Sequence, residues 1–164
     1  MVDKSKMRKI FNRIEISTIS MKSNEKKVKD KINKFLPERL KNLEEKKKKK
    51  FYEIETYNFE GEFGENKSKT TYKVFKKYPF DVFYEIMKEI NKEEIKRIEE
   101  SLDERIDDNN YLYLRFNKRD WFLEDKLNLT EEGNCLHVKC HIQTYPAKKS
   151  KAKDKFKKLL DNLR

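Results

Sequence analysis

Hydrophobic side chains recur at every second position in several stretches of the chain, which is the period of a strand with one buried face. The clearest case is 111–117, which follows an Asp-Asn turn. Its inward positions are Leu112, Leu114 and Phe116. Its outward positions are Tyr111, Tyr113, Arg115 and Asn117. Alternation of this kind predicts further strands at 8–21, 70–76, 120–129 and 134–145. Another strand is predicted to start at Phe51, with Ile54 facing inward.

Apolar residues spaced three or four apart predict the helices between these strands. One helix follows a Ser23 cap, a second spans 38–47 after Pro37, and others start at Pro79 and at an Asn91–Glu94 capping box. The last spans 148–164, with a stripe of Ala152, Phe156, Leu159, Leu160 and Leu163. This order predicts an α+β fold, a two-layer sandwich with helices packed on one face of a mixed, mostly antiparallel sheet of about five or six strands.

The whole chain, 1–164, is expected to be a single domain, with a basic helical insertion at 38–50 and a basic C-terminal helix. Two helical pieces between the first two strands form a crossover, which permits parallel pairing of those strands. A turn at 57–66 holds two of the three glycines of the chain, so we expect it to need their backbone freedom.

Charge is distributed unevenly around a net charge of +11. Residues 1–50 hold 18 basic and 7 acidic side chains, residues 51–132 hold 14 and 21, and residues 133–164 hold 9 and 2. Basic ends around an acidic middle are expected if the ends meet a polyanion. A compositional origin competes with this interpretation, because 33 of the 41 basic residues are lysine, which also accompanies thermophily or genome bias.

Two surfaces are candidates for binding RNA. The first consists of lysines that would contact phosphates without reading sequence: Lys46, Lys47, Lys48, Lys49, Lys50, Lys148, Lys149, Lys151, Lys153, Lys155, Lys157 and Lys158. The second is the outward face of the sheet, where aromatic and cationic side chains stack with bases: Tyr111, Tyr113, Arg115 and Lys139, with His137 and His141 beside them. Glu53 and Glu55 are expected on that face and weaken the second case. A solvent-facing cross-strand pair or a subunit contact is the alternative role for each tyrosine.

The sequence gives little support for a catalytic site or a metal-binding site. Cys135, His137, Cys140 and His141 fall in one predicted strand, where Cys140 points away from the other three, so neither a disulfide nor a zinc site is expected. Acidic residues at 103–108 could bind a divalent metal, but no nucleophile or base accompanies them. The three glycines form no phosphate loop. We therefore expect no catalytic residues, no metal and no cofactor, and a protein that is not an enzyme; a metal-dependent ribonuclease is the remote alternative.

Several short motifs follow one another along the chain: Ile14-Glu15-Ile16-Ser17, the glycine turn at 60–66, Glu104-Arg-Ile-Asp107, YLYLRFNK at 111–118, and Tyr145-Pro146 before a lysine-rich helix. In this order they resemble the archaeal RNA-binding family described as a predicted exosome subunit, over nearly the whole chain. The resemblance implies a fold similar to the large-subunit ribosomal protein that binds 5S RNA, and a non-enzymatic, RNA-binding role. The lysine run before Phe51 and the segment 121–126 depart from that family.

We therefore expect a non-catalytic RNA-binding protein, an accessory of archaeal RNA processing or degradation by the exosome, or of ribosome-related RNA. Its expected partners are structured RNA and exosome or ribosome components. The alternative is a protein-interaction subunit or homodimer that uses the outward sheet face. No apolar run approaches the length of a membrane span and the first residues lack a signal-peptide core, so the expected location is cytoplasmic, without membrane contact.

Overall fold

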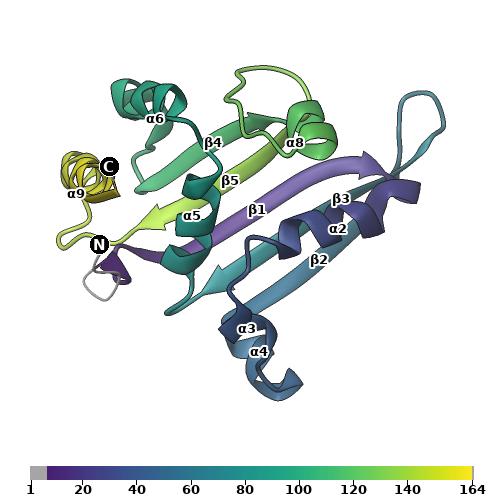
Figure 1. Ribbon diagram of the computed structural model, residues 1–164, viewed down its shortest axis with the longest axis horizontal. Helices are drawn as coiled ribbons and strands as arrows, with labels where there is room; N and C mark the ends of the chain where they lie inside the picture. Colours follow the sequence, from purple (N-terminus) through teal and green to yellow (C-terminus); the bar gives the residue numbers. More distant parts are fainter. Residues whose placement is uncertain (1–6, 164) are drawn as a thin grey trace.

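A five-stranded sheet, in the order β2-β3-β1-β5-β4, is the scaffold of the computed structural model, which describes residues 7–163 (Figure 1). The strands are β1 (Phe11–Met21), β2 (Tyr52–Glu60), β3 (Asn66–Phe75), β4 (Tyr111–Asn117) and β5 (Cys135–Ile142). Every neighbouring pair is antiparallel. β1 and β2 therefore run in the same direction, as the crossover allows, but β3 lies between them and they do not pair.

The longer helices lie on one face of this sheet, so the α+β class predicted from the sequence is confirmed. α2 crosses β1 and β3, α5 crosses β1, and α9 lies beside α6 (Figure 1). The helical segments are η1 (Lys22–Asn24), α2 (Glu25–Asn33), α3 (Glu38–Lys41), α4 (Glu45–Phe51), α5 (Pro79–Lys88), α6 (Lys92–Glu100), α7 (Leu102–Arg105), α8 (Lys118–Glu124) and α9 (Lys149–Leu163). Among residues 7–163, none is both long and apolar enough to cross a membrane.

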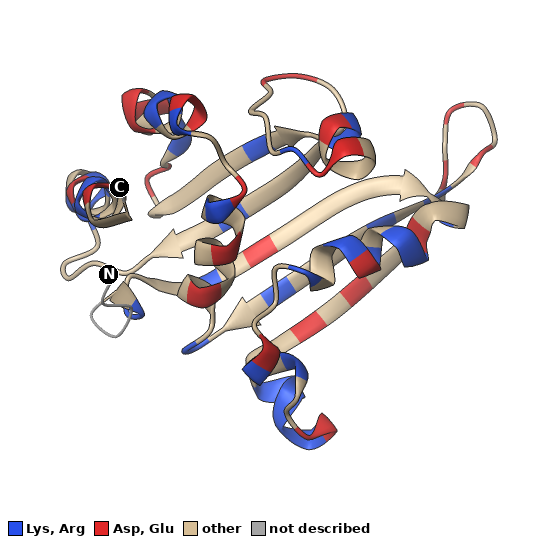
Figure 2. Ribbon diagram, viewed as in Figure 1, with Lys and Arg blue, Asp and Glu red and all other residues tan. Residues whose placement is uncertain are grey.

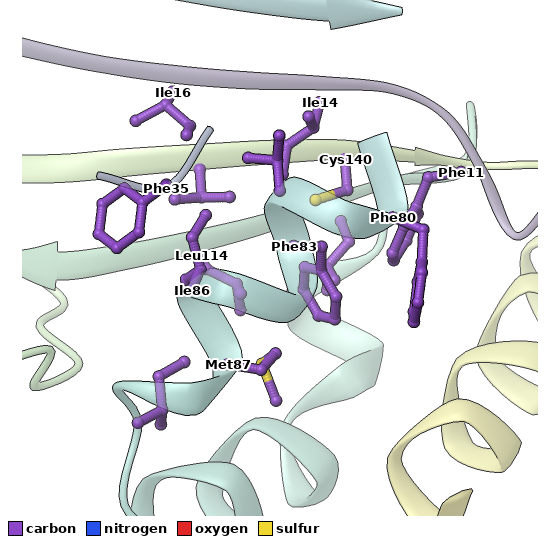
Figure 3. Packing of buried hydrophobic residues seen from close by; sticks show 14 of the residues in the cluster. Phe11, Ile14, Ile16, Phe35, Phe80, Phe83, Ile86, Met87, Leu114 and Cys140 are labelled. Carbon is purple, nitrogen blue, oxygen red and sulfur yellow. The ribbon is translucent and has the colours of Figure 1, made fainter. Parts of the chain in front are cut away.

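The core lies between the sheet and the helices, where the inward side chains of the strands meet α5 (Figure 3). Phe83 of α5 contacts Phe11 of β1 edge-on, with ring centroids 4.8 Å apart. It also contacts Phe156 of α9, with centroids 5.8 Å apart. Because Phe156 is fully buried, the predicted apolar stripe of the last helix is confirmed as its docking face. Arg164, the last residue of that predicted helix, lies outside the described residues.

The turn between β2 and β3 needs glycine, as expected. Gly64 has a φ of 77°, a left-handed conformation that side chains disfavour. The N–H of Gly61 donates to the carbonyl of Glu65 at 2.8 Å, which closes the turn. This tight connection lets β3 begin at Asn66, so the strand is longer than the predicted 70–76.

The predicted strand at 120–129 is wrong, because its first half is the helix α8. The side chain of Asn117 accepts a hydrogen bond from the N–H of Asp120 at 3.0 Å and caps this helix. Trp121 is buried, and Asp125, with a φ of 55°, ends the helix. Only a single bridge, from Leu129 to Phe116, resembles strand pairing there.

Other boundaries also differ from the prediction. The segment predicted as one helix at 38–47 is two short helices, α3 and α4, and α4 continues to Phe51, so β2 starts one residue later than expected. β1 starts at Phe11 rather than at residue 8, and α2 has Asn24 instead of Ser23 at its N-cap. Ile54 shares the core side of the sheet with Tyr72 but is 42% exposed, because β2 is an edge strand beyond the helices.

Candidate nucleic-acid interface

The sheet face opposite the core carries polar and aromatic side chains. Along β1, β4 and β5 the outward side chains are half-buried or exposed, whereas the inward ones are buried. We call this outward surface the open face; on the three strands it includes Arg13, Glu15, Ser17, Ile19, Met21, Tyr111, Tyr113, Arg115, Asn117, Cys135, His137, Lys139 and His141. The strand register therefore brings the predicted residues Tyr111, Tyr113, Arg115 and Lys139 together.

The aromatic rings of the open face pair with imidazoles on the neighbouring strand. The rings of Tyr111 and His141 lie 4.8 Å apart, and Tyr113 stacks on His137 at 5.7 Å. The ammonium group of Lys139 lies 4.3 Å from the centre of the Tyr111 ring and 5.6 Å from that of Tyr113. Cross-strand pairing, the alternative role considered for the tyrosines, therefore exists, and it gathers the rings into one cationic aromatic patch.

Acidic side chains lie on the same face, as expected for Glu53 and Glu55. Lys73 on β3 lies 3.1 Å from Glu55 and 4.0 Å from Glu53, so these carboxylates are neutralised near the β2 edge. Glu15 on β1 lies 2.9 Å from Arg13 and 3.9 Å from Lys139. The acidic groups on β1 and β2 are thus paired with cations. At the β4 side, Asp107 accepts a hydrogen bond from Tyr113, and Glu104 and Glu131 line a pocket with the exposed Arg115.

The two lysine clusters predicted from the sequence lie at separate corners of the molecule. Figure 2 shows the basic helix α4 below the sheet and α9 at its left. Lys46, Lys47, Lys49 and Lys50 are exposed on α4, and Lys48 pairs with Glu45 at 3.1 Å. The structure therefore does not combine the clusters into one basic surface.

Lys155 of α9 adjoins the open face, whereas α4 contacts the opposite edge of the sheet at β2 and β3. Lys155 and His141 line the same pocket of about 510 Å³, together with the exposed Tyr145. Lys151 donates to the carbonyl of Tyr145 at 3.3 Å. The open face thus continues from His141 to one flank of α9.

Part of the lysine cluster on α9 also holds the helix in place. Lys149 donates to the carbonyl of Asp103 at 2.8 Å, and Lys153 pairs with the carboxylate of the same residue. The hydrogen bond from Lys153 holds the pKa of Asp103 below its ordinary value. Lys148, Lys157 and Lys158 are exposed and face solvent, so they are better placed for phosphates than Lys149 and Lys153.

The cysteines and histidines of β5 separate as the strand pattern predicts. Cys140 is fully buried in the core, and burial raises the pKa of its thiol. Cys135, His137 and His141 lie on the open face, and both thiols are free. Within residues 7–163, no group of three His, Cys, Asp or Glu side chains is arranged to hold a metal ion.

Sequence reasoning missed Lys69 of β3, which reaches the same pocket as Arg115 and His137. The strand predicted at 70–76 begins one residue after Lys69 and so left it out of the sheet. The alternating positions of Lys67, Lys69 and Lys73 are a signal in the sequence that could have extended that strand. Ser17 and Asn134 join the pocket through the pairing of β1 with β5 and through the loop before β5, which no local signal could show.

A family model described as RNA binding matches residues 13–142, from β1 to the end of β5. Three solved structures, described as DUF54 proteins, have similar folds. They come from Archaeglobus fulgidus (TM-score 0.67, 24% identity, 92% of this chain and 99% of that one), Sulfolobus solfataricus (0.69, 22%, 92% and 98%) and Methanothermobacter thermautotrophicus (0.63, 21%, 92% and 98%). At such identities the likeness concerns the fold alone. No curated protein matches the sequence. Because the family model covers most of the chain, this protein belongs to the RNA-binding family.

Proposed function

We propose that this protein binds structured RNA without catalysing a reaction, and that the open face and the adjoining flank of α9 form the contact surface. The observation that carries the proposal is the continuity of these two regions. Tyr111, Tyr113 and Lys139 lie on the open face, His141 lies at its end, and Lys155 of α9 lines the same pocket as His141. Membership of the RNA-binding family supports the same conclusion.

Each part of this surface has a distinct role toward RNA. Lysines on α9 contact phosphates and contribute affinity that falls with salt but does not depend on sequence. Aromatic rings on the open face stack with unpaired bases, which single-stranded loops and bulges of a structured RNA present. Lysines of α4 form a second basic surface, separate from the open face and α9. Any phosphate contacts that they make add to the affinity for RNA independently of those two regions.

The resemblance found in the sequence suggests finer assignments. Exosome or ribosome components as partners, a fold relation to the 5S-RNA-binding ribosomal protein and a cytoplasmic location extend the proposal. Purification of the tagged protein from its native cell after cross-linking, followed by identification of RNA and proteins, tests these assignments together. Recovery of RNA without exosome or ribosome components would limit the proposal to RNA binding.

Binding of a fluorescent stem-loop RNA, followed by anisotropy at increasing salt, tests the proposed function. We expect the logarithm of the association constant to fall linearly with the logarithm of the salt concentration, by about 0.7 to 0.9 for each phosphate contacted. The same RNA incubated with protein and Mg²⁺ or Mn²⁺ should remain intact. Absence of binding at low salt contradicts the RNA-binding proposal, and cleavage that requires divalent ions contradicts the non-enzymatic part.

A homodimer is the second candidate, favoured by the alternating charges that cross the open face. The register sets Glu53 opposite Lys73, Lys73 opposite Glu15, and Glu15 opposite Lys139. Such a row is complementary to a second copy of itself, and Tyr57 adds a ring that is 67% exposed. Light scattering on the purified protein tests this candidate: a dimer that Tyr113→Ala separates, with RNA affinity unchanged, would assign the open face to self-association.

A further inference from the structure

A pocket of about 250 Å³ lies on the open face where the end of β1 meets the loop before β5. Polar and cationic side chains from four strands and this loop line it: Ser17, Lys69, Arg115, Asn134, Cys135 and His137. The strand register explains their convergence, because Ser17 and Arg115 are the direct neighbours of His137 on its two sides. Residues distant in sequence thus meet at one point of the sheet.

Positive charge dominates this pocket. None of the residues that line it is acidic. Glu15, the nearby carboxylate that favours protonation of His137, already pairs with Arg13 and Lys139. At the rim, the ammonium group of Lys118 contacts the carbonyl of Ile19. Arg115 also lines a neighbouring pocket with Glu104 and Glu131. The lining of the present pocket holds no carboxylate of its own, so Arg115 and Lys69 give it a positive potential.

His137 presents an unused hydrogen-bonding atom in this setting. Its Nε2 is buried and has no hydrogen-bond partner within residues 7–163. Burial, followed by the charges of Arg115, Lys139 and Lys69, lowers the pKa of its imidazole. A buried polar atom without a partner is costly, and three cations around it favour a negatively charged partner.

We propose that this pocket binds a phosphate group, which Arg115 contacts through its guanidinium and Lys69 through its ammonium. Ser17 donates a hydrogen bond to it, and His137 donates from its buried Nε2 once the ring turns toward the bound anion. Guanidinium and phosphate match in a two-point contact, so Arg115 is the main ligand. The phosphate is an internal phosphodiester or a terminal phosphate of RNA. This choice of RNA as the source of the phosphate rests on the proposed function. The pocket thereby gives the open face a fixed anchor beside the stacking surface of Tyr113.

Phosphate binding is expected to raise the pKa of His137, because an anion stabilises the protonated imidazole. The charged groups that face this residue are Arg115 from β4, Lys69 from β3, Glu15 from β1 and Lys139 from β5 itself. Three of these four groups are cations and lower the pKa of the imidazole in the free protein. A bound anion offsets their charge, so the pKa of His137 should rise when phosphate binds.

The two histidines of the chain make a direct test feasible, because each gives its own imidazole NMR signals. Inorganic phosphate is added at constant ionic strength, with chloride as the control anion. We expect the His137 signals to shift with saturation and its titration to move to higher pH. His141, whose Nδ1 lies 2.7 Å from the amide oxygen of Asn12, should not respond. No shift at His137, or equal shifts at both residues, overturns the pocket assignment.

Binding of RNA supplies the second arm. The double variant Lys69→Gln/Arg115→Gln removes the two cations of the pocket. Arg119→Gln/Lys126→Gln removes the same charge from exposed positions on and after α8 and serves as the matched control. We expect the pocket variant to bind RNA at least ~10-fold more weakly than wild type and the control to stay within about 2-fold.

The outcomes of the two arms are distinguishable. If wild type binds RNA and both double variants bind equally well, the pocket assignment is wrong and RNA binding stands. If phosphate shifts His137 but wild type binds no RNA, the proposed function is wrong and the pocket stands as a site for another phosphate. Oligonucleotides with a 5′-phosphate or a 5′-hydroxyl then separate a terminal phosphate from an internal one, because only a terminal site discriminates between them.

Discussion

The hydroxyl of Tyr113 donates a hydrogen bond to Oδ2 of Asp107 at 2.9 Å. Oδ1 of the same carboxylate accepts the N–H groups of Asn109 and Tyr111, each at 2.9 Å. One side chain therefore closes the turn before β4 and orients a ring of the open face. The turn that the sequence marks by its Asp-Asn composition is thus physically connected to the proposed RNA surface.

Replacement of Asp107 by Asn should make Tyr113 easier to ionise. Burial and then the hydrogen bond and charge of Asp107 raise the pKa of Tyr113 to about 12. Without the negative charge, the phenol should titrate closer to its ordinary value of about 10. The difference in ultraviolet absorbance between Asp107→Asn and Asp107→Asn/Tyr113→Phe, followed against pH, isolates this residue. A pKa of about 12 retained in Asp107→Asn would show that burial alone is responsible.

Acid should remove the stabilisation that Asp107 provides. Burial alone raises the pKa of this carboxyl group, but hydrogen bonds from Tyr111, Tyr113 and Asn109 outweigh it, so the folded-state pKa lies below the ordinary value. The unfolded state then binds more protons, and the stabilisation, present above about pH 4, is lost as pH falls through the folded-state pKa. Urea unfolding of wild type and Asp107→Asn should differ by about 1–2 kcal/mol at pH 7 and less at pH 3. A difference that does not depend on pH contradicts this assignment.

Charge reversal should separate the two lysine clusters. We expect glutamate at Lys148, Lys151, Lys157 and Lys158 of the α9 region to weaken RNA binding and to lower the salt slope by about 1 for each lysine that binds a phosphate. Lys149 and Lys153 are kept because they hold α9 to Asp103. Glutamate at Lys46, Lys47, Lys49 and Lys50 of α4 is the matched set, since it changes the net charge equally. Weaker RNA binding in the α4 set than in the α9 set would move the RNA surface to the β2 edge.

Truncation of Phe156 should destabilise the fold through α9. This ring is fully buried against Phe83 and Phe11, with centroids 5.8 Å and 6.4 Å away. Phe156→Ala leaves a cavity in that cluster and should lower the free energy of unfolding by about 3–5 kcal/mol. Lys157→Ala, one residue along on the exposed side, is the control and should change it by less than about 0.5 kcal/mol. A small effect in Phe156→Ala would mean that α9 does not depend on the packing of this ring.

Local pattern was a reliable guide where side-chain burial repeats with one period. β4 and β5 alternate without interruption, and the stripe containing Phe156 matches the face that α9 buries. Prediction failed where a short local interaction competed with alternation. The side chain of Asn117 starts α8 at a position where the hydrophobic pattern suggested a strand, because one capping bond and the burial of Trp121 outweigh a weak two-residue period.

The site shows the same division more strongly. The sequence alone determined which residues face outward on β4 and β5, because alternation along a strand depends only on backbone geometry. It also determined that basic charge is concentrated at the ends of the chain. Only the tertiary structure decided that α4 and α9 lie at separate corners, and that Lys69, Ser17 and Arg115 converge on His137. Strand order and register arise from the packing of the entire sheet, so no local stretch of sequence specifies which outward side chains become neighbours.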